Sequence, residues 1–323
     1  MAEPARFRRA RLIYNPIAGW RRERREHELR RAVALLAASG LRAELVPTAG
    51  PGSATTLAGE AIGAGCDLII VSGGDGTINE AVNGMVGTRV PLAVLPAGTG
   101  NALARELELP LDPWRAAEYI PRGVVRRIAL GRALGQAGRR QASSGQAGSR
   151  YFIATAGAGA DANIIHRLST RTKLRWGMLS YWFEGLRQWA QYDFREFDVE
   201  VNGETLTATL LVVGRAQNYG GPVQITRGAD LLGDDFEVAV FPRRPRVFYL
   251  LYLAAQFVGL LERCPRVRFL RTRKLVARPR DARVHVHADG ELIGELPMEF
   301  EIVPDALSLL LPRALADARR IEI

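Results

Sequence analysis

The sequence predicts an α/β plus β protein with two domains, a doubly wound α/β domain followed by a β-rich domain. Over the first 110 residues, short apolar strand patterns alternate with helical patterns, whereas after Pro110 the strand patterns follow one another closely. At 323 residues, with 47% hydrophobic and 24% charged residues, the chain is long enough to bury two hydrophobic cores.

The first domain is expected from four strand-helix units in succession. A helical pattern follows each strand pattern, which is typical of a mostly parallel sheet with right-handed connections. The strand patterns cover residues 11–15, 44–46, 68–71 and 92–95, and the third and fourth helical patterns cover residues 77–86 and 101–107.

The second domain is expected from hairpin-like alternation of apolar and polar residues. The alternating segments are residues 196–201, 205–213, 236–241 and 284–288. Residues 135–150 are low in apolar residues, and we interpret them as a mobile hairpin tip because strand patterns flank them closely. The expected domains are residues 1–124, joined by the C-terminal residues 308–323, and residues 125–307.

Composition limits the cellular setting and the partners. The formal charge is +10, and only two of the basic residues are lysines, Lys173 and Lys274. Neither a zinc-finger spacing nor an aromatic RNA-binding motif is present, so we expect no nucleic-acid partner. Two cysteines, no signal-peptide pattern and no apolar run long enough to cross a bilayer predict a cytoplasmic protein.

Glycine-rich or hydroxyl-bearing loops follow the first four strand patterns. Because the carboxyl ends of parallel strands lie at one edge of a sheet, we expect these loops to converge there. Glycines let backbone amides approach a polyphosphate, and the following helix adds the partial positive charge of its N-terminus. The loops contain NPIAG at residues 15–19, Thr48, GGDGT at residues 73–77 and PAGTGN at residues 96–101.

Asp75 lies in the middle of the third loop, where a carboxylate would repel an anion. It is compatible with polyphosphate if Mg²⁺ lies between them, or if it faces an acceptor hydroxyl and helps to remove its proton. Either role indicates phosphoryl transfer, and the alternative is a helix N-cap. A P-loop or protein-kinase site is excluded, because GxxxxGK[ST] is missing and no lysine occurs in the first 170 residues.

Residues 71–84 and 95–110 resemble the catalytic domain of the diacylglycerol kinase and sphingosine kinase lipid kinases. NAD kinases and phosphofructokinases are more distant relatives that share the GGDG element. The resemblance extends over nearly the whole chain: NPIAG is similar to the family's NPxSG, with Ala18 in place of serine. Further similar stretches are residues 152–161, 218–238 and 287–291, the last containing the family's DGE.

The resemblance implies a nucleotide domain followed by a β-sandwich-like domain, with ATP in the cleft between them. It implies that Glu291, with Asp289 beside it, accepts the proton of a lipid hydroxyl, and that Asp75 organises Mg²⁺. Asn79 and Glu80 match positions that hold the corner of the site together. The residues implied to contact ATP or to organise its Mg²⁺ are Asn15, Pro16, Ile17, Ala18, Gly19, Thr48, Gly73, Gly74, Asp75, Gly76, Thr77, Asn79, Glu80, Thr99, Gly100 and Asn101.

The residues themselves support the Glu291 assignment only in part. In an extended strand over residues 284–288, His285, His287 and Asp289 share one face, which we interpret as solvated. A polar turn of the Asp-Gly type is the alternative interpretation of Asp289 and Glu291. The two histidines lack a third metal ligand in the sequence pattern.

The chain departs from the family at three places. Ala102 stands where diacylglycerol-phosphorylating members often have aspartate, and Ala129 stands where a strand carries an acid. The Asp-Gly of a structural metal loop appears reversed, as Gly233-Asp234; Asp234 is the candidate metal ligand there, and Asp235 is the alternative. The lipid therefore stays open, and two alternatives remain: a soluble-substrate kinase of the NAD kinase type, and a nucleotide-binding protein without catalysis.

Two apolar segments bear on how a lipid would be reached. Residues 244–274 place an apolar helix between arginine clusters, for which core packing is favoured over an interfacial position. Residues 176–189 hold three tryptophans and line a lipid cleft or belong to the core. We expect a peripheral, transient association with a membrane that contains anionic phospholipid, and leave the oligomeric state open, a homodimer included.

Overall fold

Two strands carry the chain between two structural units. The structure is a computed structural model that describes residues 7–19, 22–135, 149–160, 162, 194–220, 223–245 and 247–320. The first unit comprises residues 1–128 and 305–323, and the second comprises residues 129–304. The connecting strands are β5 (Val124–Gly135) and β18 (Met298–Leu311).

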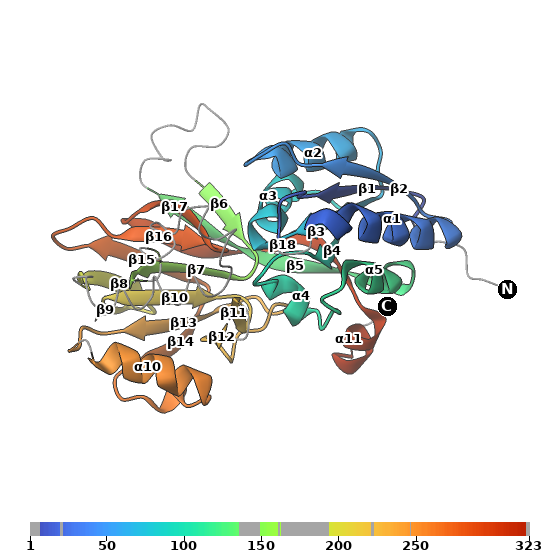
Figure 1. The fold of residues 1–323 in the computed structure, drawn as a ribbon. Coiled ribbons are helices and arrows are strands. Elements are labelled where there is room, and N and C mark those ends of the chain that lie inside the picture. Colours follow the sequence, from blue (N-terminus) through green and yellow to red (C-terminus); the bar gives the residue numbers. More distant parts are fainter. Residues whose placement is uncertain are drawn as a thin grey trace. The chain divides into compact units, whose positions relative to one another are not determined.

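The first unit is built on a parallel sheet. Its strands pair in the order β2-β1-β3-β4, and the end of β18 joins β4 in parallel through Leu309 and Leu92. This confirms the predicted α/β domain (Figure 1). The elements are β1 (Arg9–Tyr14), α1 (Arg22–Ala38), β2 (Arg42–Pro47), α2 (Ser53–Gly63), β3 (Leu68–Gly73), α3 (Asp75–Met85), β4 (Leu92–Pro96), α4 (Ala102–Glu106), α5 (Pro113–Ala116), the 3-10 helix η1 (Ala117–Arg122) and α11 (Arg313–Ala318).

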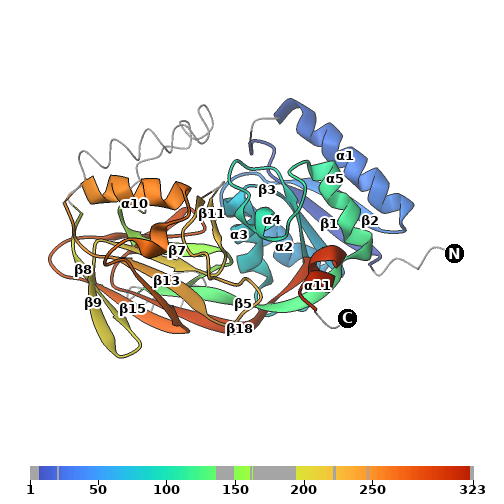
Figure 2. The same cartoon turned by 90° about the horizontal axis from the view of Figure 1, so that it is seen from below.

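Helices cover this sheet closely enough to bury every residue of β3. Leu29 and Leu36 of α1 pack against β1, β3 and β4, and Figure 2 shows α1 and α5 side by side. Helices α2 and α3 contact β1 and β3 and lie close to each other, since a Cβ at Gly84 would be 2.4 Å from the Thr55 carbonyl oxygen. Close packing leaves the loops at the strand ends as the accessible part of the sheet.

The second unit contains mainly antiparallel strands. One sheet has the order β18-β15-β8-β9, with β5 beside β18 and β6 beside β5, and the other has the order β14-β13-β10-β7-β16-β17. The remaining elements are β6 (Ser149–Phe152), β7 (Thr155–Gly159), β8 (Phe197–Val201), β9 (Glu204–Ala208), β10 (Leu210–Gly214), β11 (Asn218–Gly220), β12 (Val223–Gln224), β13 (Phe236–Phe241), α10 (Val247–Phe257), the 3-10 helix η2 (Leu261–Arg263), β14 (Arg268–Thr272), β15 (Lys274–Pro279), β16 (His285–Ala288) and β17 (Glu291–Glu295).

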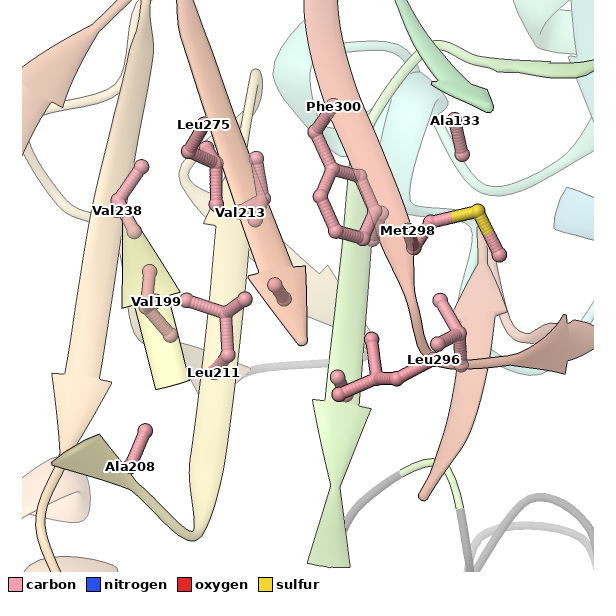
Figure 3. Close-up of a cluster of buried hydrophobic side chains, with 14 of the residues drawn as sticks. Ala133, Val199, Ala208, Leu211, Val213, Val238, Leu275, Leu296, Met298 and Phe300 are labelled. Atoms are coloured by element: carbon pink, nitrogen blue, oxygen red, sulfur yellow. The ribbon is translucent and has the colours of Figure 1, made fainter. Parts of the chain in front are cut away.

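The two sheets of the second unit enclose a common hydrophobic core. Alternate residues of each strand point into it, as Figure 3 shows for Leu275 and Phe300 of one sheet and Leu211 and Val238 of the other. The predicted β-sandwich-like domain is therefore confirmed.

The expected strand over residues 205–213 is wrong in one respect. It is two strands, β9 and β10, which belong to different sheets, and Thr209 lies between them. The buried Thr209 donates its amide to the Phe241 carbonyl oxygen at 2.9 Å, where the chain crosses from one sheet to the other.

Two interpretations fall largely on residues outside the described ranges. Strands β5 and β6 pair antiparallel, as expected of a hairpin, but the tip at residues 136–148 lies outside the described ranges. The tryptophan-containing segment at residues 176–189 also lies outside them.

Candidate active site

The two glycine loops of the first unit touch each other. A Cβ atom built on Gly98 would lie 2.5 Å from the Cα atom of Gly74, so neither backbone leaves room for a side chain at position 98. The Ala97 amide also donates to the Gly73 carbonyl oxygen at 3.1 Å. The prediction that these loops meet at one edge of the sheet is confirmed.

The loop after β1 joins them at the point where the strand order reverses. Strand β1 lies between β2 and β3, so the chain leaves β1 in one direction and returns on its other side. Asn15 donates from Nδ2 to Oγ1 of Thr77 at 3.2 Å, and its Oδ1 accepts the Ile17 amide at 3.0 Å. Thr48 follows β2, and its amide donates to the Tyr14 carbonyl oxygen at 2.8 Å. Hydrogen bonds thus link the loops that follow β1, β3 and β4.

Asp75 is the first residue of α3, so it does not occupy the N-cap position of that helix. Gly74 is the N-cap residue and provides no side-chain hydrogen bond. Instead, Oδ1 of Asp75 accepts the backbone amide of Ala102 at 2.7 Å, at the start of α4. The carboxylate therefore spans the two glycine loops and is held at the edge where we expect phosphate.

Asn101 tightens the second glycine loop. Its side chain accepts the Gly98 amide at 2.8 Å and donates to the Gly98 carbonyl oxygen at 2.9 Å. Asn101 has φ 52°, a left-handed conformation that asparagine tolerates better than most residues. The remaining predicted ligands of these loops lie on the surface: Thr99, Pro16 and Ile17 are exposed, and Ala18, Gly76 and Gly100 are half-buried.

Asn79 and Glu80 support the loops from inside. The buried Asn79 accepts hydrogen bonds from Nδ2 of Asn83 through its backbone and its side chain. Glu80 accepts the Ala54 amide at 3.2 Å through Oε2 and the Thr55 hydroxyl at 2.8 Å through its carbonyl oxygen. The Glu80 contacts hold α2 against α3, and those of Asn79 lie within α3, so both residues stabilise the helix that begins at Asp75.

Arg25 is a site residue that sequence reasoning missed. It is 4% exposed, and its Nη1 donates to the Ala97 carbonyl oxygen at 2.9 Å. Gly19 lies beside it with φ 63°, and a Cβ there would be 3.2 Å from Nη2 of Arg25 and 2.3 Å from that carbonyl oxygen. The guanidinium brings a positive charge to the glycine loops. Nothing in the arginine-rich run around position 25 distinguishes this arginine, because only the fold places it.

In the second unit, the turn after β16 buries Asp289. The interpretation of a solvated strand face is wrong: His287 is 1% and Asp289 is 6% exposed, with Tyr219 against the His287 ring and the backbone of residues 153–155 against the Asp289 carboxylate. The Asp289 carboxylate accepts three backbone amides, from Ile153 at 2.8 Å and from Ala154 and Thr155 at 2.9 Å. Asp289 at φ 45° and Gly290 at φ 78° form the two-residue turn expected of Asp-Gly. These contacts favour an anchoring role for Asp289.

Glu291 differs from Asp289 in its surroundings. It is the first residue of β17, its side chain is 39% exposed, and its Oε2 is 2.9 Å from Nη2 of Arg150. Of the two carboxylates, Glu291 is the one that a substrate can reach. His287, the buried neighbour on β16, has Nε2 3.2 Å from the Tyr219 hydroxyl.

The loop before β13 does not fit a metal ion at Asp234. A buried guanidinium already lies among its carbonyl oxygens: Arg215 is 0% exposed and donates to Gly233, Leu231 and Ala129 at 2.6, 2.7 and 2.8 Å. Burial lowers the pKa of Arg215 to about 10, so it stays protonated at neutral pH. Asp234 itself points to Arg273 at 3.6 Å, and no cluster of three acidic, histidine or cysteine side chains occurs among the described residues.

Asp75 remains the residue that fits Mg²⁺. Mg²⁺ in kinases is commonly held by one or two carboxylates together with substrate phosphates, and Asp75 is a single carboxylate between two phosphate-type loops. At the two positions that lack an acid, the backbone makes the contact: the Ala102 amide donates to Asp75, and the Ala129 carbonyl oxygen accepts from Arg215.

Comparison with known proteins matches both halves of the chain. The family model described as "Diacylglycerol kinase catalytic domain" matches residues 9–133, and that described as "YegS C-terminal NAD kinase beta sandwich-like domain" matches residues 154–311. The "Diacylglycerol kinase" of Bacillus subtilis (strain 168) is 27% identical over 316 residues, covering 96% of this chain and 99% of that protein.

Two further comparisons agree. The "Diacylglycerol kinase" of Mycobacterium tuberculosis (strain H37Rv) is 30% identical over 259 residues, covering 78% of this chain and 79% of that protein. A crystal structure of a diacylglycerol kinase from Bacillus anthracis (strain Sterne) has a TM-score of 0.74 at 22% identity, covering 96% of this chain and 99% of that chain. The last comparison concerns the fold alone.

Proposed function

The chain belongs to the diacylglycerol kinase family, and on that premise we propose that it is an ATP- and Mg²⁺-dependent lipid kinase. The observation that carries the proposal is the contact between the two glycine loops, with the Asp75 carboxylate bonded across them. Such loops present backbone amides to phosphates, and a carboxylate among them calls for a cation.

The reaction we propose transfers the γ-phosphoryl group of ATP to a lipid hydroxyl. The hydroxyl oxygen forms a bond to the γ-phosphorus, the bond from that phosphorus to the β,γ-bridging oxygen breaks, and ADP leaves. The glycine loops bind the phosphates, the buried Arg25 adds its positive charge behind them, and Asp75 holds the metal. Glu291 takes the proton that the hydroxyl loses. When bound, Mg²⁺ neutralises charge on the phosphates.

The residue roles in this proposal follow from their surroundings. Asp289 has three amide donors on its carboxylate and serves to fix the turn that presents Glu291. Arg150 orients Glu291 through the ion pair between them. Phosphoryl transfer depends mainly on positioning and electrostatic stabilisation, so we expect both supports to matter for rate.

The test is transfer of labelled phosphate from ATP to lipid in vesicles that contain diacylglycerol or a sphingoid base. We expect labelled lipid with the wild type and at least a hundredfold loss with Asp75→Ala or Glu291→Ala. Glu44→Ala and Glu204→Ala, which remove exposed carboxylates from β2 and β9, are matched controls and should keep the activity. Unlabelled lipid with the wild type, or full labelling with Asp75→Ala, would reject the proposal.

A second candidate is a kinase for a soluble acceptor. It is favoured by the match of residues 154–311 to a domain described as "NAD kinase beta sandwich-like". Phosphorylation of NAD without vesicles would support it, and phosphorylation confined to lipid would exclude it. A nucleotide-binding protein without catalysis is supported if ATP binds but no acceptor is labelled, because Ala102 and Ala129 lack the acids of related sequences.

A further inference from the structure

Helix α10 presents an apolar stripe to solvent. Val247 is 62%, Leu251 49% and Val258, just after the helix, 68% exposed, and Ala254 is also exposed. These positions follow the spacing i, i+4, i+7 and i+11, which places them on one face of a helix. The helix contains no charged residue, whereas the outward face of a surface helix usually carries charges.

The opposite face of α10 packs against the second unit. Tyr252 and Ala255 are buried, and Tyr252 packs with Val212 and Phe241 in a core beside β10 and β13. The Tyr249 hydroxyl is 2.6 Å from Oγ1 of Thr209. Figure 1 shows α10 on the outer side of β13 and β14. Core packing therefore holds for one face of this helix, and the other face is exposed.

Arginines flank the stripe at both ends. Arg243 and Arg244 precede α10, and Arg263 and Arg266 follow it, with Glu262 the single acidic residue in residues 242–280. Arg243, Arg263 and Arg266 are exposed, and Arg244 is half-buried.

These four arginines differ from the other basic residues of the same region. Across the ranges that the structure describes, none of the four forms an ion pair. By contrast, the basic residues in and next to β14 and β15 all pair with acids: Arg268, Arg271, Arg273, Lys274, Arg278 and Arg280. Among the described residues, no carboxylate therefore forms an ion pair with the positive charges at the ends of α10.

We propose that the outward stripe of α10 and the four flanking arginines dock the protein on a bilayer surface rich in anionic phospholipid. Apolar side chains enter the interface while guanidinium groups reach the phosphates, and neither needs a membrane-spanning segment. Within the described part of the chain, no helix is long and apolar enough to cross a bilayer. The inference rests on the proposed function for its purpose, delivery of a lipid acceptor, but the docking is measurable without ATP.

The experiment measures flotation of the full chain with phosphatidylcholine vesicles, with and without phosphatidylglycerol, and without nucleotide. An arginine near an anionic surface is worth roughly fivefold in affinity, so a triple change of Arg243, Arg263 and Arg266 to Gln should cost on the order of a hundredfold. The matched control changes Arg268, Arg278 and Arg280 to Gln, which removes the same charge from paired positions and should cost far less.

A second pair of variants tests the stripe. Leu251→Asp with Val258→Asp should weaken binding at least tenfold, whereas Leu111→Asp, at an exposed position of the first unit, should not. None of these altered positions belongs to a hydrophobic core cluster, so circular dichroism of the variants should match that of the wild type. Equal binding to both vesicle types, or equal binding by the stripe variants and Leu111→Asp, overturns the inference.

Two further measurements distinguish membrane docking from self-association and from catalysis. If Leu251→Asp with Val258→Asp dissolves a dimer in sedimentation velocity and leaves vesicle binding unchanged, the stripe is a self-association surface and the inference is overturned. Kinase activity on a detergent-solubilised acceptor reports on the proposed function alone. Vesicle binding without activity on any acceptor would contradict the kinase proposal and would still support the docking surface.

Discussion

Replacing Arg215 by alanine tests how the loop before β13 is held. The substitution removes a guanidinium that is 0% exposed and donates to three carbonyl oxygens, at positions 129, 231 and 233. These acceptors belong to β5 and to the loop, so a single side chain ties two distant segments together. The Arg215 amide adds a bond to the Ala154 carbonyl oxygen, which the substitution leaves intact.

The expected cost follows from burial. Breaking a buried charged interaction by removing one partner costs about 3–5 kcal/mol, because the remaining polar groups are left without compensation. The matched control is Arg271→Ala, which removes an ion pair with Asp235 on the same loop. The Arg271 side chain is 54% exposed, so we expect a cost of about 0–1 kcal/mol there.

The assay is calorimetric unfolding of both variants and the wild type, with urea unfolding followed by circular dichroism as a second measure. Each is repeated with EDTA and with Mg²⁺ in the absence of nucleotide. The wild type should unfold alike in both, because Arg215 already binds the loop's carbonyl oxygens. Equal stability of the two variants, or a wild type destabilised by EDTA, would refute this role of Arg215.

Three further predictions concern the candidate active site. Gly98→Ala should weaken ATP binding and lower stability by about 1–3 kcal/mol, because its Cβ would meet Gly74 at 2.5 Å, whereas Gly74→Ala, with 3.6 Å available, should fold normally in thermal melts. Asp289→Ala should lower the unfolding free energy by about 2–4 kcal/mol, because it leaves three amides unpaired. Glu291→Ala should change stability little and abolish lipid labelling. A larger loss of stability with Glu291→Ala than with Asp289→Ala would contradict the roles assigned. Arg25→Gln should raise the Kd for ATP, measured by calorimetry, about tenfold or more, and an unchanged Kd would remove Arg25 from the phosphate site.

The sequence predicted the architecture and the loops well, for a local physical reason. Strand β3 begins with four apolar residues and ends in Ser72 and Gly73, and such apolar runs are typical of buried parallel strands. Once four strand-helix units follow one another, their strands are parallel, and the glycine loops at the carboxyl ends lie at one edge. The contact between Gly74 and Gly98 was therefore predictable, although its closeness was not.

The individual partners of the polar residues depended on the tertiary structure. Alternation placed His287 and Asp289 on one strand face but carried no information on what covers that face. In the structure both are buried, Asp289 against the backbone amides of residues 153–155 and His287 against Tyr219. Thr209 looked like the middle of a strand, because alternation does not show where a chain changes sheets.

The sequence by itself determined the two-domain order, the glycine loops and the position of Asp75 among them. Only the tertiary structure decided that Asp75 binds the Ala102 amide, that Arg25 reaches the Ala97 carbonyl oxygen and that Arg215 occupies the place expected for a metal. The reason is separation along the chain. Secondary structure follows from neighbours a few residues apart, whereas a buried charge is compensated by groups that only folding brings within hydrogen-bond distance.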